Sequence, residues 1–402
     1  MTFNNSISKT AGTGYTWTAG TTRTDAGSQN VTATLDSTTP YIWSDNTTGT
    51  KTISCSIGKA ALTITADNKT MTYGGSAPSY SYTVSGLKGT DTQANVVTGT
   101  ATYTIKSGST TVTVGSTTNV GTYSIVPSGL TIGSNYSANY AAGTLTVNKK
   151  SLTPSVTASD KTYDGTTSAT CNVTLSGIVS GDTVTANATG TFSDADVGTG
   201  KTVTCSGIAL SGTSKDNYSL STTSKTTTAN ITAKSIAVTW GTTTSFGYDG
   251  SSHAPTVTTP VTGVSGESIA LSVSGAGTNA GSYTATASCS SVTGGRAKCS
   301  NYTLSSNTKA FTITAKGITV TASNQNKTYD GSALSADTTC SVTSGSLLSG
   351  HTLVCTSTGS QTAAGSSTKT LSTVKVMNGT TEVTSSYTIT KGNGTLTVNK
   401  KS

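Results

Sequence analysis

The sequence predicts an all-β protein, built as an elongated tandem array of small β domains, and three observations support this. Charged residues make up only 10% of the 402 residues, against roughly 25% in typical soluble domains. Thr, Val, Ile and Tyr, which suit a pleated backbone, are plentiful, whereas Leu, Met, Glu and Gln, which favour helices, are scarce. Apolar residues alternate with polar ones, and this regularity argues against a disordered Ser/Gly linker.

A recurring pattern divides the chain: an alternating strand, a Lys with a small neighbour, and a new apolar start. TLTVNKKSL at 144–152 returns as TLTVNKKS at 395–402. Related forms stand at 52–62, 229–236 and 310–318. Self-similarity of this kind is the signature of a repeat protein. We therefore predict a partial unit at 1–59 and complete units at 60–149, 150–234, 235–316 and 317–401.

Each complete unit opens with a strand and a tight turn. The turns are NKTMTYGG (68–75), DKTYDG (160–165), SFGYDG (245–250) and NKTYDG (326–331). Glycine adopts a positive φ at low cost, which a tight turn needs. We expect the Tyr at each turn to pack its ring inward and to keep its hydroxyl at the rim.

Two further marks recur later in the units. A glycine turn leads into a strand at 25–31, 119–125, 196–203 and 279–285. An Asn-Tyr step follows near the end of the unit and becomes Ser-Tyr in the last one. We assign this step to Asn139-Tyr140, Asn217-Tyr218, Asn301-Tyr302 and Ser386-Tyr387.

Units of this length, with short strands and frequent turns, predict Ig-like β-sandwiches, and a β-grasp-like topology is the alternative. No helical pattern separates the strands, so parallel βαβ architecture is not expected. Because the junctions between units are short, we expect the units to form an extended string.

The motifs resemble repeat domains of bacterial surface proteins. The stretch from KTYDG at 161–165 to ANITAK at 229–234 is similar to the YDG domain. Residues 61–150, with YGG, NVGTYSI and TLTVNKK, resemble the MBG domain that accompanies it, and 235–316 resemble a variant. The resemblance covers about residues 25–401. It implies an adhesin-like stalk at the bacterial cell surface, without catalytic residues.

Charge and hydropathy exclude two classes of partner. The net charge is +8, but the 24 Lys and Arg are spread along the chain, and only Lys149-Lys150 and Lys400-Lys401 are adjacent. A nucleic-acid binder would gather them in a stripe. No apolar run approaches ~18 residues, so we expect no membrane insertion. The first ten residues do not have the pattern of a signal peptide.

The two histidines lie in different units, and we interpret both as structural. A metal site or a general base needs His with a partner close by. His253 follows the turn at 248–250, and His351 takes the place of Asp182. Asp194 and Asp196 could contribute to a calcium site, but about six to eight oxygens are needed, and turn capping is the expected use. We predict no metal and no cofactor.

No catalytic pattern is complete. Gly200-Lys201-Thr202 resembles a phosphate loop, but Ala195 stands where that motif needs Gly, and a strand-like run follows. Ser and Thr abound, yet neither a G-x-S-x-G elbow nor a neighbouring His accompanies them. A Lys–Asn isopeptide bond needs a buried acid beside the pair, and we expect none, because Glu267 and Glu382 are the only glutamates and Asp stands mostly in turns. We also expect no ice-binding Thr array. The protein is predicted not to be an enzyme.

The cysteines predict disulfides and an oxidising, extracellular compartment, because six of the seven fall two to a unit. When Gly181 is aligned with Gly350, Cys171 and Cys340 coincide. Their partners do not, because Cys205 aligns with Thr373 and Cys355 with Ala186. The Cα atoms of two bonded cysteines must lie within roughly 7 Å. If both pairs form, the strand that carries Cys171 or Cys340 must therefore lie close to two different strands of the same fold. Cys55 has no partner in its unit. The disulfide candidates are Cys171, Cys205, Cys289, Cys299, Cys340 and Cys355.

Three functional hypotheses follow. The first is a structural stalk that presents a binding region elsewhere in a larger surface adhesin, whose partners would be host or environmental glycans or proteins. The second is a binding module in which Trp17, Trp43 or Trp240 contacts a glycan or a host protein. The third is a subunit of a phage- or pilus-like fibre that associates with itself through open edge strands. Aromatic residues buried at the cores would favour the stalk.

Overall fold

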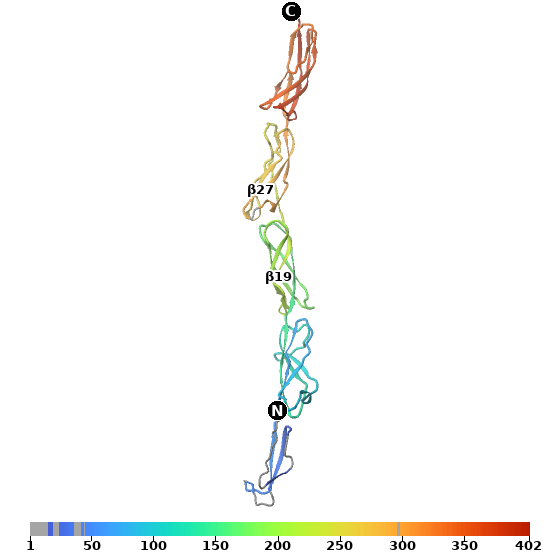
Figure 1. The fold of residues 1–402 in the computed structure, drawn as a ribbon. Coiled ribbons are helices and arrows are strands. Elements are labelled where there is room, and N and C mark those ends of the chain that lie inside the picture. Colours follow the sequence, from blue (N-terminus) through green and yellow to red (C-terminus); the bar gives the residue numbers. More distant parts are fainter. Residues whose placement is uncertain (1–14, 19–23, 36–41, 44, 296–297) are drawn as a thin grey trace. The chain divides into compact units, whose positions relative to one another are not determined.

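The computed structural model describes residues 15–18, 24–35, 42–43, 45–295 and 298–402. Strands dominate these ranges, and the longest α-helix among them has four residues (Figure 1). The predicted class, tandem all-β domains, is therefore confirmed. The predicted units 1–59, 60–149, 150–234, 235–316 and 317–401 are called the first to fifth segments below.

Compactness divides the chain in another way, into two units whose boundary passes through the third segment. The segment boundaries therefore remain predictions, and each unit is described by itself. One unit comprises Met1–Thr157, Cys171–Thr189 and Cys205–Lys225, and the other comprises Ala158–Thr170, Gly190–Thr204 and Thr226–Ser402.

The first segment contributes one antiparallel sheet, in which β2 lies between β1 and β3. Val31 and Ala33 of β2 are buried, and the residues between them are less so, as expected for a strand with one covered face. The strands are β1 (Tyr15–Thr18), β2 (Gly27–Leu35) and β3 (Thr50–Ile57).

The second segment is a sandwich of two sheets, with strand orders β12-β4-β6 and β5-β13-β10-β8-β9, and a small β11-β7 pair. Leu62 and Ile64 of β4, Ile125 of β10 and Leu145 of β13 are all fully buried. The elements are β4 (Ala60–Ala66), β5 (Lys69–Thr72), β6 (Tyr82–Ser85), α1 (Gln93–Val96), β7 (Val97–Thr98), β8 (Thr102–Ser107), β9 (Thr110–Thr111), β10 (Gly121–Ser128), β11 (Thr131–Ile132), β12 (Tyr136–Ala141) and β13 (Gly143–Asn148).

In the second, third and fifth segments the chain changes sheets at an Asp or Asn after its opening strand. In the second segment, β4 pairs in parallel with β12, and after two residues β5 pairs in parallel with β13 of the other sheet. At the switch, Asn68 Oδ1 accepts a hydrogen bond from Thr144 N at 2.8 Å. Asp160 and Asn324 accept equivalent bonds from Asn230 and Thr395. This side chain joins the switch to the closing strand of its segment.

The third segment repeats this plan with a five-stranded sheet of order β16-β22-β20-β19-β17 and the pairs β14-β21 and β15-β18. Its elements are β14 (Lys150–Leu152), β15 (Pro154–Ala158), β16 (Lys161–Thr162), β17 (Ser168–Ala169), β18 (Cys171–Leu175), β19 (Thr185–Phe192), β20 (Gly198–Ser211), η1 (Lys215–Asn217), β21 (Tyr218–Leu220) and β22 (Ser224–Thr232).

The fourth segment has a five-stranded sheet of order β24-β29-β27-β26-β25 and a parallel β23-β28 pair. Its elements are β23 (Lys234–Ala237), β24 (Ser245–Gly247), β25 (Val261–Thr262), η2 (Val264–Gly266), β26 (Ser268–Ser274), β27 (Gly281–Thr293), η3 (Cys299–Asn301), β28 (Tyr302–Ser305) and β29 (Thr308–Thr314).

The fifth segment pairs a β33-β30-β38 sheet with a β31-β39-β36-β34 sheet, and β37 extends β36. Its elements are β30 (Lys316–Ala322), β31 (Gln325–Thr328), β32 (Leu334–Ser335), β33 (Cys340–Ser344), β34 (His351–Thr358), β35 (Ser360–Gln361), β36 (Gly365–Asn378), β37 (Thr381–Glu382), η4 (Thr384–Ser386), β38 (Tyr387–Gly392) and β39 (Gly394–Asn399).

The tight turns at the start of the complete segments form as predicted. Gly74, Gly165, Gly250 and Gly331 have φ values of 85°, 77°, 83° and 86°, a region that residues with a Cβ avoid. The turn Tyr N–H then bonds the end of the closing strand, as Tyr163 N does to Thr232 O at 2.8 Å. Although the turn comes early in the sequence of its segment, the turn tyrosine therefore lies beside the end of the closing strand.

Candidate functional site

Among the described residues, buried tyrosines from consecutive segments pack edge to face at three places. One member comes from the turn at the start of a segment, and the other from the Asn-Tyr or Ser-Tyr step of the next segment. This geometry suits the ring quadrupoles. We call each pair, with the polar side chain between its hydroxyls, a tyrosine junction. The pairs are Tyr73–Tyr218 (centroids 5.3 Å apart, planes at 78°), Tyr163–Tyr302 (5.5 Å, 80°) and Tyr248–Tyr387 (5.5 Å, 79°).

In the first of these junctions, Asp182 accepts from both tyrosines. Tyr73 Oη lies 2.8 Å from Asp182 Oδ2, and Tyr218 Oη lies 2.5 Å from the same oxygen. Val179 N donates to Tyr218 Oη at 2.8 Å. Hydrogen bonds to a carboxylate are stronger than neutral ones, so Asp182 holds both rings in place.

In the second junction, Glu267 takes this role and is itself only 1% exposed. Tyr163 donates to Glu267 Oε1 at 2.7 Å, and Tyr302 donates to Oε2 at 2.5 Å. A buried carboxylate is tolerated when its oxygens are hydrogen-bonded, and each oxygen here has one tyrosine.

His351 occupies the same place in the third junction. Its Nδ1 lies 2.8 Å from Tyr387 Oη, and its ring centroid is 6.3 Å from that of Tyr248. Leu348 N donates to Tyr387 Oη at 3.1 Å. The equivalence of His351 with Asp182 that the sequence indicated is therefore a structural one.

A second polar contact accompanies each junction. Its acceptor is the Asn or Ser that comes directly before the Tyr of the Asn-Tyr or Ser-Tyr step. Its donor is a backbone N–H in the glycine turn of the preceding segment, that of the residue directly before the glycine. Two of these asparagines also donate back, Asn217 to Asn119 Oδ1 at 2.9 Å and Asn301 to Asp196 Oδ1 at 3.0 Å. The acceptor pairs are Asn217 with Val120 N (2.9 Å), Asn301 with Val197 N (3.0 Å) and Ser386 with Ala280 N (3.0 Å).

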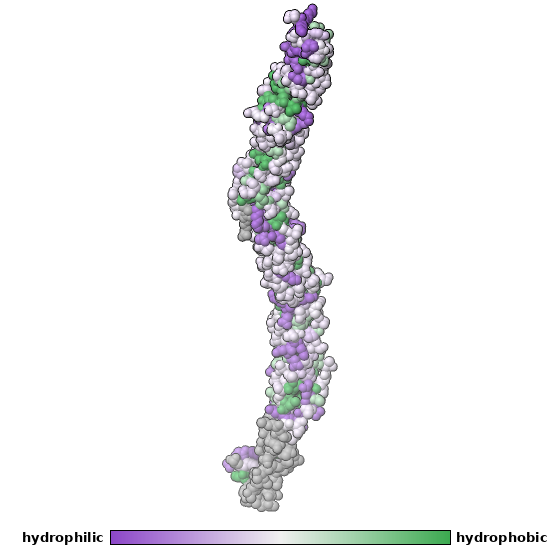
Figure 2. All heavy atoms as spheres, turned by 45° about the horizontal axis from the view of Figure 1, so that its top comes forward, coloured by the Kyte–Doolittle hydropathy of each residue, from purple (hydrophilic) through white to green (hydrophobic). Residues whose placement is uncertain are grey.

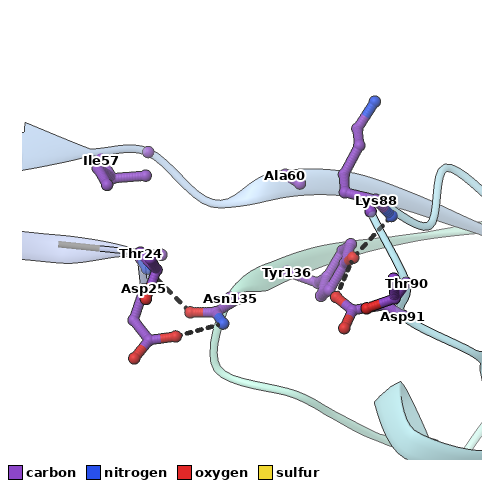
Figure 3. A pocket seen from close by; sticks show the side chains of 12 residues that line it. Thr24, Asp25, Ile57, Ala60, Lys88, Thr90, Asp91, Asn135 and Tyr136 are labelled. Carbon is purple, nitrogen blue, oxygen red and sulfur yellow. Dashed lines mark hydrogen bonds between the residues drawn. The ribbon is translucent and has the colours of Figure 1, made fainter. Parts of the chain in front are cut away.

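The second segment has the same kind of carboxylate and Asn-Tyr contacts where it meets the first segment, next to a small pocket (Figure 3). Tyr136 donates to Asp91 Oδ2 at 2.6 Å, and Lys88 N donates to Tyr136 Oη at 2.8 Å. Asn135 accepts from Ala26 N and donates to Asp25, both at 2.8 Å. The pocket, about 220 Å³, is lined by these residues and by Ile57, Gly58 and Ala60. Its lining contains no turn tyrosine.

This arrangement corrects one assignment. We placed the Asn-Tyr step of the second segment at Asn139-Tyr140, but Asn135-Tyr136 makes the junction contacts. Tyr136 is 4% exposed, whereas Tyr140 is 37% exposed. The expectation that turn tyrosines keep their hydroxyls at the rim is also wrong for Tyr163, whose hydrogen bond to Glu267 is buried.

Burial and the neighbouring carboxylates change the acidity of these tyrosines. Burial, helped by Asp182, raises the pKa of Tyr73 to about 12. Burial and Glu267 raise the pKa of Tyr302 to about 12, and that of Tyr163 is also raised. The hydrogen bond from Tyr218 lowers the pKa of Asp182. At neutral pH the hydroxyls therefore donate to an ionised acceptor at Asp182.

The other residues singled out in the sequence take structural roles. His253 Nε2 lies 2.8 Å from Asp249 Oδ1, and the imidazole stacks on Phe246 at 4.9 Å. Gly200-Lys201-Thr202 lies within strand β20, as the strand-like run predicted, and no helix follows it. Lys201 Nζ donates to Asp194 at 2.6 Å.

Asp194 and Asp196 have separate partners. Asp194 Oδ1 accepts from Asp196 N at 2.9 Å, which is the predicted turn use. Asp196 accepts from Lys298 Nζ at 2.6 Å and from Asn301 at 3.0 Å, and so belongs to the second junction. Within the described residues, no group of three or more His, Cys, Asp and Glu could hold a metal ion.

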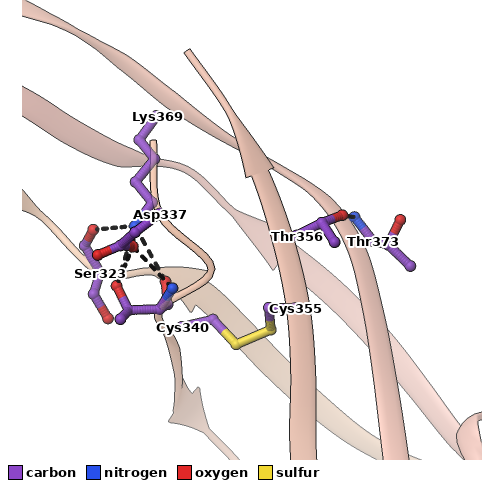
Figure 4. The surroundings of a disulfide bond; sticks show 8 residues. Ser323, Asp337, Cys340, Cys355, Thr356, Lys369 and Thr373 are labelled. Atoms are coloured by element: carbon purple, nitrogen blue, oxygen red, sulfur yellow. Dashed lines mark hydrogen bonds and ion pairs between the residues drawn. A yellow bond between two sulfur atoms is a disulfide. The ribbon is translucent and has the colours of Figure 1, made fainter. Parts of the chain in front are cut away.

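The six candidate cysteines form three disulfides in the structure. Cys171–Cys205 joins β18 to β20, and Cys340–Cys355 joins β33 to β34, so both link two different sheets (Figure 4). Cys289–Cys299 closes a ten-residue loop before Tyr302. Thr373 lies across from Thr356, beside Cys355, which places it on the neighbouring strand β36. The side chain of Cys55 lies outside the described part.

Lys369, which the sequence analysis did not single out, lies beside the Cys340–Cys355 disulfide (Figure 4). Its side chain is fully buried, and its Nζ donates to Asp337, Ser323 O and Thr339 O. A buried ammonium needs such partners. Asp337 itself is 42% exposed.

The tryptophans with described side chains are hydrogen-bonded. Trp240 Nε1 donates to Ser306 O at 2.8 Å, and its ring packs against the core of the fourth segment. Trp43 Nε1 donates to Gly49 O at 2.8 Å. The side chain of Trp17 lies outside the described residues. On the face in Figure 2, hydrophobic residues form several small separate patches, not one large patch that would mark a binding surface.

Two stretches of the chain match models of known domain families. Residues 148–228 match the YDG domain, and residues 62–146 match the MBG domain (YGX type). The resemblance to these repeat domains is thereby confirmed. No curated protein matches the chain. Among solved structures, surface layer protein SbsC, domains 4–9, aligns with 97% of this chain and 74% of that chain, at 14% identity and a TM-score of 0.15.

The chain therefore contains two stretches that are similar to repeat domains of surface proteins. Disulfides persist in oxidising compartments, and three of them join described residues. Together with the two repeat domains, they indicate an extracellular protein. None of the helices in the described ranges is long and apolar enough to cross a membrane.

Proposed function

We propose that this chain is a structural stalk segment of an extracellular bacterial surface adhesin, which presents a binding region elsewhere in the full-length protein. The observation that carries the proposal is the tyrosine junction, which occurs three times with one geometry. A stalk must hold its repeats at a fixed spacing, and a recurrent buried contact between repeats serves that purpose.

The contacts at each junction are strong enough to matter. An aromatic pair contributes about 0.5–1.5 kcal/mol beyond its buried area, and a hydrogen bond to a charged group contributes about 1.5–3 kcal/mol. The second junction has two such bonds on Glu267, and Val197 N donates a further hydrogen bond to Asn301 Oδ1. Separating the third and fourth segments would remove Tyr163, one of the two hydroxyl donors of this buried carboxylate.

Three described side chains that a binding module or an enzyme could use are engaged in the fold, and this supports the stalk over those alternatives. Trp240 packs on a core, His253 stacks on Phe246, and His351 lies in a junction. We infer that the protein has no catalytic role.

Spin labels on the third and fourth segments test the mechanical part of the proposal. In a chain that carries Cys55→Ser, Thr191→Cys and Ser272→Cys introduce labels at exposed strand positions. We expect one narrow distance distribution in the labelled chain and a broad one after Tyr163→Ala and Glu267→Ala are added. Glu382→Ala, which removes the other glutamate, should leave the distribution narrow. A distribution that is already broad in the labelled chain would contradict a stalk.

Protease treatment of intact source cells tests the location. Trypsin should release peptides from residues 60–401 without cell lysis, because a stalk is exposed along its length. Recovery of these peptides only after lysis would contradict the surface assignment, whatever the outcome of the distance measurement.

A further inference from the structure

Tyr329 in the fifth segment is a turn tyrosine that lacks the cover that its counterparts have. Tyr73, Tyr163 and Tyr248 are 3%, 1% and 5% exposed, whereas Tyr329 is 43% exposed. A single exposed aromatic residue is ordinary on a protein surface, so what singles out Tyr329 is the contrast with its three buried counterparts.

The turn that carries Tyr329 is nevertheless built as in the other segments. Tyr329 N donates to Asn399 O at 2.9 Å, as Tyr163 N does to Thr232 O. Gly331 has a φ of 86°, and Lys327 Nζ bonds Asp330 at 2.9 Å, as Lys161 bonds Asp164 at 2.8 Å. The ring is therefore held at the same place on its segment as the buried tyrosines, and only the covering partner differs.

The second contact point of a junction is present on the same segment. Ala363-Ala364-Gly365 is the glycine turn that precedes β36, and Ala364 is exposed. In the preceding segments the residue at this position, Val120, Val197 or Ala280, donates its N–H to an Asn or Ser. The N–H of Ala364 is thus placed to donate in the same way.

The local sequence matches one junction in particular. Residues 395–402, TLTVNKKS, are identical to residues 144–151, which lead into the third segment. The third segment covers Tyr73 with Asp182, Asn217 and Tyr218. A partner with this set would satisfy Tyr329 and Ala364 in the way seen there.

We propose that Tyr329 and the Ala363-Ala364-Gly365 turn form a docking surface for another repeat of the same kind, at the end of that repeat that carries a carboxylate and an Asn-Tyr step. The Tyr329 hydroxyl donates to the carboxylate, the partner tyrosine packs edge to face on the Tyr329 ring, and the partner Asn accepts from Ala364 N. This inference does not depend on the stalk function, because it concerns recognition between repeats.

A lengthened chain tests the surface. Because 395–402 repeat 144–151, a second copy of residues 152–234 can be attached after Ser402 without altering the junction sequence. Tyrosine nitration, mapped by mass spectrometry, reports exposure. We expect Tyr329 to react readily in the 402-residue chain, with Tyr140 as the exposed standard, and to fall to the low reactivity of Tyr73 in the lengthened chain. Equal reactivity of Tyr329 in the two chains would overturn the proposal.

A matched control separates docking from mere proximity. Asp182→Ala and Asn217→Ala, made only in the added copy, should restore the reactivity of Tyr329. Recovery of the Cys171–Cys205 disulfide from the added copy shows that it has folded. Independently, Tyr329→Ala should lower the melting temperature of the lengthened chain and leave that of the 402-residue chain unchanged. An equal effect on both chains would contradict docking at Tyr329.

Discussion

Asp182, Glu267 and His351 occupy one position in three repeats and differ in chemistry. Each follows a glycine with positive φ, namely Gly181 (92°), Gly266 (77°) and Gly350 (80°). The loop backbone therefore aims three different polar side chains at the junction: Asp182 and Glu267 each bond two tyrosine hydroxyls, and His351 bonds that of Tyr387. What the position requires is a group that can accept a hydrogen bond from a buried phenol, and a carboxylate or a neutral imidazole both meet that need.

Removal of Glu267 should destabilise the chain, because two buried hydroxyls lose their acceptor. Each unsatisfied buried group costs about 1–3 kcal/mol, so Glu267→Ala should lower the free energy of unfolding by at least about 2 kcal/mol. Denaturant unfolding of the full chain measures this. Glu382→Ala, at an exposed ion pair with Lys375, should have a much smaller effect, because exposed ion pairs contribute little to stability. Equal effects of the two substitutions would contradict a buried role for Glu267.

The junction tyrosines should also make the fold sensitive to alkali. Tyr302 has a folded pKa of about 12, above the value of about 10 for a free tyrosine. A raised folded pKa stabilises the fold below pH 10, and this stability is lost as the pH rises through 12. Phenolate absorbance should show a late-titrating group that Tyr302→Phe removes. A titration curve unchanged by Tyr302→Phe would show that this tyrosine is not held in a buried junction.

At the scale of the element, the two repeats with inter-sheet disulfides use different strands for one purpose. Cys171 and Cys340 lie at aligned positions, and each bonds a strand of the facing sheet, β20 in one case and β34 in the other. The sequence alignment could predict this use of two strands. Cys205 aligns with Thr373 of β36, and β36 pairs with β34, the strand that carries Cys355. Lys369, by contrast, gave no signal in the sequence, since its burial depends on carbonyls from two distant loops.

Loss of the Cys340–Cys355 disulfide should destabilise the fifth segment. The bond spans 15 residues, and a loop of this size contributes about 3 kcal/mol in the chain-entropy model. The double change Cys340→Ala and Cys355→Ala should lower the melting temperature, and a reducing agent should then cause a smaller further drop than in the parent. Non-reducing peptide mapping should recover all three bonds. Free thiols in native protein at these six positions would refute the disulfide assignment.

Lys369 and Asp337 should not be equivalent, although they form one ion pair. Asp337→Ala leaves a fully buried ammonium with only neutral acceptors, whereas Lys369→Met leaves a carboxylate that is 42% exposed and can be hydrated. Breaking a buried pair costs about 3–5 kcal/mol when the remaining charge stays buried. We therefore expect Asp337→Ala to lower the free energy of unfolding more than Lys369→Met does. The opposite order in denaturant titrations would contradict the burial of Lys369.

At the scale of the whole molecule, the sequence predicted what repeats locally and missed what forms between segments. The strands, the glycine turns and the paired cysteines come from patterns within one segment. The junction of Tyr163 with Glu267 joins residues 104 positions apart, and no local period indicates it. The wrong choice of Asn139-Tyr140 arose because Asn-Tyr occurs twice in that segment. The distance to the closing Lys-Lys pair distinguishes the two, because Tyr136 lies 13 residues before Lys149, as Tyr387 does before Lys400.

Calcium, the metal that the paired aspartates most suggested, should leave the stability of the chain unchanged. Asp194 is neutralised by Lys201 and Asp196 by Lys298, so neither carboxylate can turn to a cation without breaking an ion pair. A calcium ion needs about six to eight oxygens, and the described residues hold no acidic group of three. Bound at 100 times its dissociation constant, a ligand would add about 2.7 kcal/mol to the native state. Thermal unfolding with calcium and with excess chelator should therefore coincide. A higher melting temperature with calcium that Asp196→Ala abolishes would show instead that this turn binds the metal.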